Sequence, residues 1–152
     1  MKKEIIIHKD ENLCCAFPRI MKISDQELVV IYIESDIRKD GTTHLDPSSR
    51  VALARSKDGG KNWYREGVVY NDKDGIQNPS IAKLSDGTLI SNFYKWYIME
   101  KEPFYHKGLG IYLIISEDKG KSWSKLEKLP CFSLEDPGTT DSVLETPSKR
   151  LL

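Results

Sequence analysis

Arg19 and Asp46 are among the residues of this chain whose side chains could bind a ligand or transfer a proton. The guanidinium of Arg19 can donate two parallel hydrogen bonds to a planar carboxylate. The carboxyl group of Asp46 lies in a loop-like stretch, and carboxyl groups can donate and accept protons. Each residue has a plainer alternative. Arg19 can be a solvated or ion-paired residue at a strand end, and Asp46, which precedes Pro47, can start a turn.

Three further groups compete with Asp46 or could tune it. Asp36 and Asp40 are carboxylates in the same stretch, and His44 is the nearby imidazole. Ligand chemistry usually sits on loops over a rigid scaffold, so residues 35–49 form the first loop of interest. For His44 the alternative is a loop histidine in solvent.

Two nearly matching octapeptides indicate which elements hold that loop. Residues 56–63 and 116–123 both read Ser-x-Asp-x-Gly-Lys-x-Trp, and they begin 60 positions apart. The aspartate can accept hydrogen bonds from nearby backbone N–H groups, and the glycine supplies backbone angles that other residues resist. The tryptophan is an apolar anchor between strands. We expect structural roles, at turns remote from any active site, for Ser56, Asp58, Gly60, Trp63, Ser116, Asp118, Gly120 and Trp123.

The repeat extends beyond the octapeptides. Residues 18–29 align with residues 79–90, and a third, weaker copy begins at residue 142. Each copy reads as a strand, a tight polar turn and a second strand, and the octapeptide hairpin completes a four-stranded unit. Four antiparallel strands per repeat are typical of a β-propeller blade. The chain is therefore predicted to be all-β, a single partial propeller domain over residues 1–152, with an N-terminal strand at 1–9 and blades at about 14–70, 76–130 and 139–152.

The octapeptide resembles the Asp-box, or bacterial neuraminidase repeat (BNR), of the sialidase superfamily. The resemblance covers the chain from about Cys14 onward. It implies a six-bladed β-propeller of retaining exo-glycosidases that release terminal sialic acids from glycoconjugates. It also implies that Arg19 is one of three arginines that bind the sialic acid carboxylate, although Pro18 precedes Arg19 here where the family's proline follows. Asp46 would be the acid/base residue, and a sialoside glycan the substrate.

The 152 residues hold only about two and a half such blades. In the resembled family the tyrosine nucleophile, its glutamate partner and the other two arginines come from later blades, so we expect the chain alone to be inactive. Its open ends would expose strand edges and apolar faces, which predicts self-association. The alternative is a non-catalytic Asp-box propeller that binds glycans or proteins.

Charge and cysteine content exclude several other classes of protein. The 23 basic and 23 acidic residues leave no net charge to attract nucleic acid or an anionic membrane. The apolar stretches are too short to span a bilayer, and the first residues lack the apolar core of a signal peptide, so the location is predicted as cytoplasmic or left unassigned. Cys14, Cys15 and Cys131 have no zinc-like spacing, and we predict no metal or other cofactor.

Overall fold

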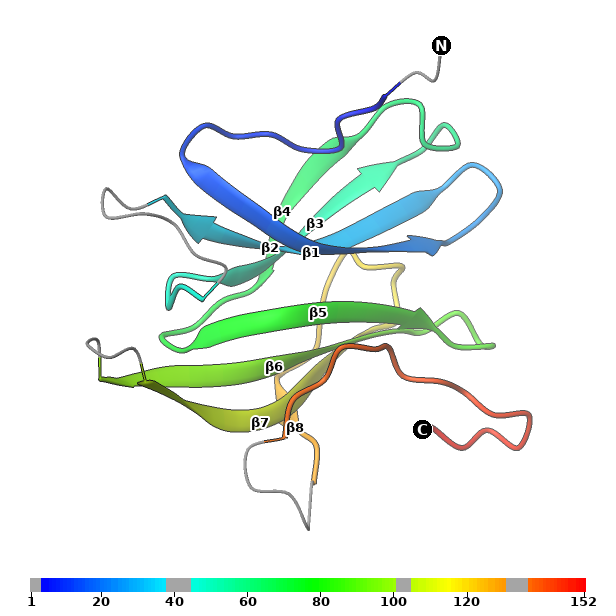
Figure 1. Ribbon diagram of the computed structural model, residues 1–152. Helices are drawn as coiled ribbons and strands as arrows, with labels where there is room; N and C mark the ends of the chain where they lie inside the picture. The colour runs from blue at the N-terminus through cyan, green and yellow to red at the C-terminus, as the bar shows by residue number, and fades with distance from the viewer. Residues whose placement is uncertain (1–3, 38–44, 101–104, 131–136) are drawn as a thin grey trace.

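The computed structural model describes residues 4–37, 45–100, 105–130 and 137–152. Within these ranges the chain is all-β and contains no helix, and hence no helix that could cross a membrane. It forms two four-stranded antiparallel sheets, with the strand orders β1-β2-β3-β4 and β5-β6-β7-β8 (Figure 1). The strands are β1 (Leu13–Lys22), β2 (Leu28–Asp36), β3 (Arg50–Ser56), β4 (Tyr64–Tyr70), β5 (Gly75–Lys83), β6 (Leu89–Glu100), β7 (Tyr105–Ser116) and β8 (Glu127–Lys128).

The central strands of the first sheet are apolar on both faces. In β2 the residues from Val29 to Ile33 are successive, and each is at most 4% exposed. Successive side chains of a strand point to opposite faces, so a continuous buried run requires a cover on each side of the sheet. The second sheet supplies one cover, and residues 5–8 together with Trp63 contribute to the other.

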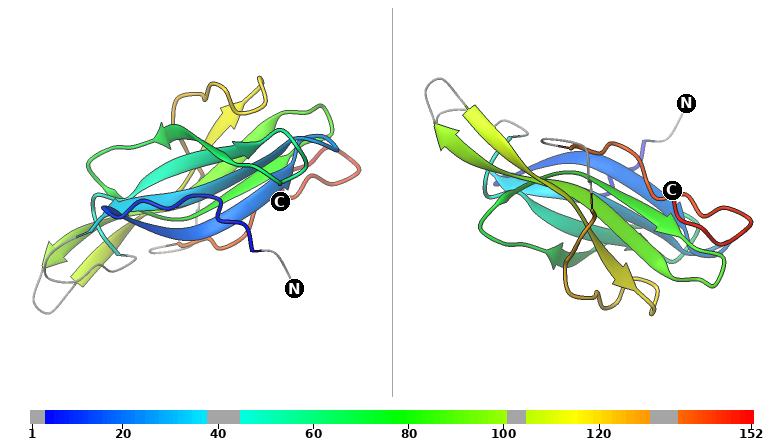
Figure 2. Two further views of the ribbon diagram at one scale, coloured as in Figure 1. Left: turned by 90° about the horizontal axis from the view of Figure 1, so that it is seen from above. Right: turned by 90° about the horizontal axis from the view of Figure 1, so that it is seen from below.

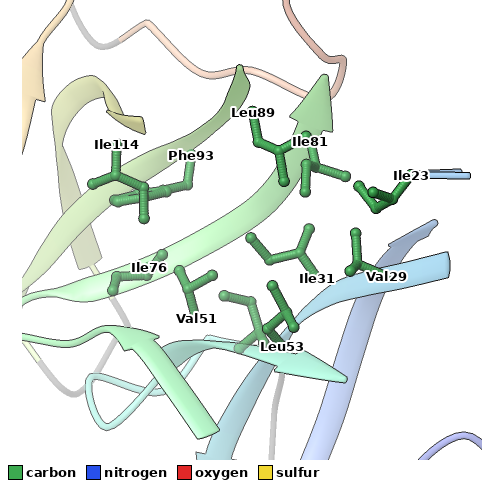
Figure 3. Packing of buried hydrophobic residues seen from close by; sticks show 11 residues of the cluster. Ile23, Val29, Ile31, Val51, Leu53, Ile76, Ile81, Leu89, Phe93 and Ile114 are labelled. Atoms are coloured by element: carbon green, nitrogen blue, oxygen red, sulfur yellow. The ribbon is translucent and has the colours of Figure 1, made fainter. Parts of the chain in front are cut away.

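The two sheets stack face to face, and the main core lies between them (Figure 1 and Figure 2). Figure 3 shows aliphatic side chains of the first sheet facing Phe93, Ile114 and other side chains of the second sheet across the layer. At about 25 cal/mol per Å² of buried apolar surface, this shared core is the main stabilising interaction between the sheets. Its buried members are Ile23, Val29, Ile31, Ile33, Val51, Leu53, Ile76, Ile81, Leu89, Phe93 and Ile114.

Polar contacts fix the sheets relative to each other at the edge of this core. The guanidinium of Arg55, on β3, donates a 2.9 Å hydrogen bond to the carbonyl of Lys119, in the second octapeptide. The ammonium of Lys83, on β5, donates a 2.8 Å hydrogen bond to the carbonyl of Ile23, in the β1–β2 turn. Each contact joins one sheet to a turn of the other, so the turns take part in the stacking.

A buried lysine holds the connection between the two sheets. Lys95, on β6, is 5% exposed, and its ammonium contacts the carboxylates of Asp72 and Asp74, the latter at 3.1 Å. It also lies 5.1 Å from the ring centroid of Tyr112, in cation–π geometry. Burial is the largest single effect and lowers the pKa of Lys95, but its hydrogen bonds to Asp72 and Asp74 and the charge of Asp72 together outweigh burial and raise the pKa above its ordinary value. The lysine is therefore charged and paired.

The first strand of each sheet is broken by a bulge at the same position of the repeat. The pairing of β1 with β2 shifts between Ala16 and Arg19, and that of β5 with β6 shifts between Gln77 and Ser80. The residue before the proline has a left-handed backbone in both, with φ of 54° at Phe17 and 50° at Asn78. Left-handed backbone is unusual for a bulky residue such as Phe17.

The predicted four-stranded repeat unit is confirmed for the first two copies. Each is an antiparallel meander, with an octapeptide between its third and fourth strands. The third copy contains only an isolated bridge between Glu145 and Leu151. The N-terminal strand predicted at residues 1–9 is not formed in its described part, because residues 4–9 have no regular secondary structure.

Candidate functional site

Arg19 lies on β1 at the exposed edge of the first sheet, immediately after the bulge. Its guanidinium donates a 2.9 Å hydrogen bond to the carbonyl of Thr140 and a 3.4 Å bond to the carbonyl of Pro18. The first of these contacts spans 121 positions of sequence and joins β1 to the segment after the second sheet. Arg19 is therefore a point where separate parts of the repeat meet.

A polar cluster from the second sheet lies at the corresponding edge. The hydroxyl of Ser80 is 2.7 Å from the amide oxygen of Asn92 and 3.1 Å from the carbonyl of Asp141. The amide nitrogen of Asn92 donates to the same carbonyl at 3.0 Å and to the hydroxyl of Thr139 at 3.4 Å. We name Arg19, Ser80, Asn92 and the segment 139–141 the inner-edge site.

Asp46 lies away from the inner-edge site, beyond the far end of β2. Arg19 pairs with Ile31, and Asp36 ends the strand, so about 16 Å of strand separates Arg19 from that end at about 3.3 Å per residue. Asp46 is 3% exposed, and its Oδ1 accepts hydrogen bonds from the backbone N–H of Ser48 at 2.8 Å and from its hydroxyl at 2.6 Å. This arrangement is the turn that the Asp-Pro dipeptide indicates.

Of the three groups that could compete with Asp46 or tune it, the structure describes only Asp36. Asp36 is described, and its carboxylate pairs with Arg50 at 2.9 Å. Asp40 and His44 lie outside the described residues, as does Cys131.

A second polar cluster surrounds Glu34, on the outer face of the first sheet. Glu34 is 0% exposed, and Arg65 donates hydrogen bonds of 2.6 and 2.8 Å to its two carboxylate oxygens. The hydroxyl of Tyr32 donates a 3.1 Å bond to it, and Arg50 is 3.6 Å away. From the N-terminal segment, Nδ1 of His8 lies 3.1 Å from the Tyr32 hydroxyl and 3.5 Å from Glu34.

The Glu34 cluster has a structural role, because its charged groups are paired with one another. Burial is the largest single effect and raises the pKa of Glu34, but the hydrogen bonds and charge of Arg65, together with the bond from Tyr32 and the charge of His8, outweigh burial and hold the pKa below its ordinary value. Burial, followed by the charge of Glu34, raises the pKa of Tyr32, so its hydroxyl stays protonated. Cys15 lies 3.6 Å from His8, and burial raises the pKa of its thiol, which disfavours the reactive thiolate. The cluster joins three strands and the N-terminal segment.

Sequence reasoning missed the Glu34 cluster, although one signal pointed to it. Glu34 continues the apolar run of β2, and a carboxylate in a fully buried strand needs a charged partner. Which arginine supplies that partner depends on the pairing of strands β2, β3 and β4.

The two octapeptides form the same turn. In the first, Oδ1 of Asp58 accepts hydrogen bonds from the hydroxyl of Ser56 and from two backbone N–H groups, at 2.9–3.1 Å. In the second, Oδ1 of Asp118 accepts the corresponding three bonds at 2.8–3.0 Å. All these bonds close within the octapeptide, so the motif specifies a local turn. In the described part of the chain, no three His, Cys, Asp or Glu side chains converge as a metal site.

Neither a family model nor a curated protein matches the chain. Among solved structures it is similar to a protein of unknown function from Dyadobacter fermentans DSM 18053, with 27% identity and a TM-score of 0.82. That match covers 97% of this chain and 48% of the other, so the chain spans about half its length. It is also similar to Zg3597, a family 117 glycoside hydrolase from the marine bacterium Zobellia galactanivorans, with 16% identity and a TM-score of 0.54. This second match covers 76% of this chain and 38% of the other.

These comparisons correct the assignment to the sialidase superfamily, which is wrong. No family model supports it, and the two structures described above are a protein of unknown function and a family 117 glycoside hydrolase. The physical reason lies in the octapeptide, whose hydrogen bonds are local and which therefore reports a hairpin turn without identifying a family. What the likeness to Zg3597 shows is a glycoside hydrolase-like all-β fold.

Proposed function

We propose that this chain contributes a carbohydrate site to a protein of the glycoside hydrolase kind, in which its two sheets are consecutive blades of a β-propeller. The fold likeness to a family 117 glycoside hydrolase supports the general class. The face-to-face stacking of two four-stranded meanders, with their first strands side by side, is consistent with blades around an axis.

The repeated bulge is the observation that carries the proposal. Bulges are over-represented beside active sites, where they re-aim a side chain. Here both first strands bulge at the same repeat position, and both do so through a left-handed non-glycine residue, Phe17 or Asn78. Backbone strain of this kind, repeated at one place, points to a site. The residues directly after the bulges, Arg19 and Ser80, belong to the inner-edge site.

The chemistry of the inner-edge site suits a sugar. It combines a guanidinium, a carboxamide and the hydroxyls of Ser80, Thr139 and Thr140, which are donors and acceptors for sugar hydroxyls. Arg19 is the proposed substrate-binding residue, because it is exposed and its present acceptors are main-chain carbonyls that a ligand oxygen can replace.

Asp46 remains the proposed acid/base residue. Glycoside hydrolysis needs a carboxyl group that can transfer a proton at the glycosidic oxygen. Both Ser48 contacts to its Oδ1 would have to open for that role. The same contacts favour a second candidate function, a site that binds glycans without cleaving them.

A combined binding and hydrolysis experiment tests both functions. The protein is screened against a panel of chromogenic glycosides for turnover and against the matching free glycans by calorimetry. Arg19→Ala should weaken binding at least about tenfold, the loss expected for a charged hydrogen bond of about 1.4 kcal/mol. Arg150→Ala, which removes an exposed arginine of the C-terminal hairpin, should leave binding unchanged.

Asp46→Asn separates the two functions. If turnover is lost while binding persists, Asp46 acts in hydrolysis. If the wild type binds glycans without turnover, the non-catalytic function is correct. If no glycan binds, or if Arg19→Ala binds as tightly as the wild type, the carbohydrate proposal is refuted.

A further inference from the structure

The outer face of the first sheet carries an exposed apolar patch. Ile5, Ile6 and Ile20 are 46%, 72% and 59% exposed. A cavity of about 350 Å³ opens beside them, lined by Ile5, Ile6, Ile7, Cys15, Pro18 and Val30 among others. We call this patch and its cavity the N-terminal face.

A second apolar patch lies at the other end of the stack. Leu144 and Leu152 pair across the C-terminal hairpin, so their side chains share one face of it, and they are 62% and 70% exposed. We call them the C-terminal face. The N-terminal and C-terminal segments lie on opposite sides of the two sheets, since one is nearest the viewer from above and the other from below (Figure 2).

The repeat assigns the C-terminal face a definite packing role. Leu144 and Leu152 occupy the positions of Met21 and Val29 in the first copy. Val29 is fully buried in the core between the sheets, and Met21 packs against it. In the first copy, the side chains at these positions therefore pack against the sheet of the next copy.

The N-terminal face occupies the complementary positions. Ile20, which is exposed, corresponds to Ile81 of the second copy, and Tyr32, which the N-terminal segment already covers, corresponds to Phe93. Ile81 and Phe93 are 3% and 0% exposed, because they are inserted into the core against the first sheet. In the second copy, the side chains at these positions therefore pack against the face of the preceding copy's sheet.

We propose that the N-terminal face of one copy of this chain docks on the C-terminal face of a second copy. The contact would continue, between molecules, the sheet stacking already present within one molecule. The two faces differ, so the interface is heterologous, and head-to-tail addition can proceed beyond a dimer. The chain has no net charge to oppose it. This inference does not depend on the proposed carbohydrate function.

Sedimentation velocity of the 152-residue chain across a range of concentrations tests the proposal. The wild type should form dimers and larger species as its concentration rises. Ile6→Asp and Leu144→Asp should each raise the dissociation constant at least tenfold. The matched control is Tyr64→Asp, whose residue is 66% exposed but lies on β4, outside both faces, and this variant should associate like the wild type.

Mixing the two variants gives the decisive measurement. Ile6→Asp keeps an intact C-terminal face, and Leu144→Asp keeps an intact N-terminal face. An equimolar mixture should therefore form a one-to-one dimer and nothing larger, although each variant alone is monomeric. Leu152→Asp replaces Leu144→Asp if circular dichroism shows that the latter fails to fold. A monomeric wild type, or a mixture that stays monomeric, overturns the proposal.

Discussion

Asp58 illustrates how much one side chain can organise when all its partners are local. Its carboxylate binds the backbone N–H and the side-chain amide of Asn62, and these bonds, led by the backbone one, lower its pKa to about 2. The bonds to Asp118 likewise hold its pKa well below the ordinary value. Both groups are ionised in the folded chain and must be protonated when the protein unfolds in acid.

Asp58→Asn should change the acid dependence of stability. The folded pKa lies below the ordinary value of 3.8, so the stabilisation is complete above pH 4–5 and is lost as the pH falls towards 2. Urea unfolding at several pH values should show a wild-type advantage that shrinks with acid. Glu117→Gln is the control, because the second turn is bonded through Asp118, and its curve should parallel the wild type. A pH-independent advantage over Asp58→Asn would contradict this account.

Gly75 marks a close approach that no other residue allows. A Cβ at this position would lie 2.3 Å from Cε2 of Trp96, whose ring is fully buried. Gly75→Ala should therefore destabilise the chain by about 1–3 kcal/mol, the usual cost of overpacking. Gly138→Ala is the matched control, since nothing lies within 4 Å of its added Cβ. Thermal melting of both variants measures the difference, and equal melting temperatures would be inconsistent with the contact.

For single residues, the sequence predicts hydrogen-bond partners that lie nearby in the chain and misses partners that lie far away in it. The partners of Asp58 lie within its own octapeptide, so the turn could be predicted from spacing. Glu34 depends on Arg65, 31 positions away, and on His8. Those partners follow from strand pairing and from the path of the N-terminal segment, which residue types alone do not specify. For Asp46 the sequence allowed two interpretations, a catalytic carboxyl group and the start of a turn, and the structure shows the turn with Ser48.

Among the elements, the connection between β4 and β5 depends on a single cation. Lys95 draws Asp72 and Asp74 onto β6, and Tyr70, at the end of β4, lies 3.5 Å from the same ammonium. Ion pairs of this kind are costly to break on one side, because the remaining charges lose their partner.

Lys95→Met should lower the free energy of unfolding by about 2 kcal/mol. That is less than the ~3–5 kcal/mol for a fully buried pair, because the Asp72 side chain is 28% exposed and partly solvated. The matched control is Lys22→Met, which removes a surface pair with Asp25 and should cost under about 1 kcal/mol. Chemical denaturation of both variants gives the comparison, and equal losses would show that Lys95 does not hold the connection.

The order of strands was predictable because turns and apolar runs alternate regularly along the chain. The repeated hairpins left one arrangement of four strands per unit, and both sheets have it. The bulges before Arg19 and Ser80 were not predictable, since Pro18 and Pro79 restrict the preceding residue but do not require a left-handed one.

At the scale of the whole molecule, neither sheet can bury its core without the other. Side chains of both sheets alternate across the layer between them (Figure 3). If the sheets separated, each would expose its share of these apolar side chains to water, at a cost of about 25 cal/mol per Å². The two sheets should therefore unfold as one cooperative unit.

Phe93→Ala tests this cooperativity, because it removes a large ring from the shared core. The loss should be about 3–5 kcal/mol. Hydrogen exchange should show that the amides of β2 and β3 lose protection by the same factor as those of β6. Met99→Ala, on β6 but 56% exposed, should leave both sheets protected. Loss of protection confined to the second sheet would mean that the sheets unfold independently.

The contact between Arg55 and the second octapeptide has a consequence for modular engineering of this repeat. The guanidinium of Arg55 donates a hydrogen bond to the carbonyl of Lys119, yet the equivalent residue of the second copy is Ile115. The two copies thus share a backbone plan but have diverged at the surface where one supports the other. A protein made only of repeats of the second copy would lack this guanidinium, and with it the hydrogen bond to the turn of the next copy. The repeat units therefore have a fixed order along the chain and cannot be exchanged freely.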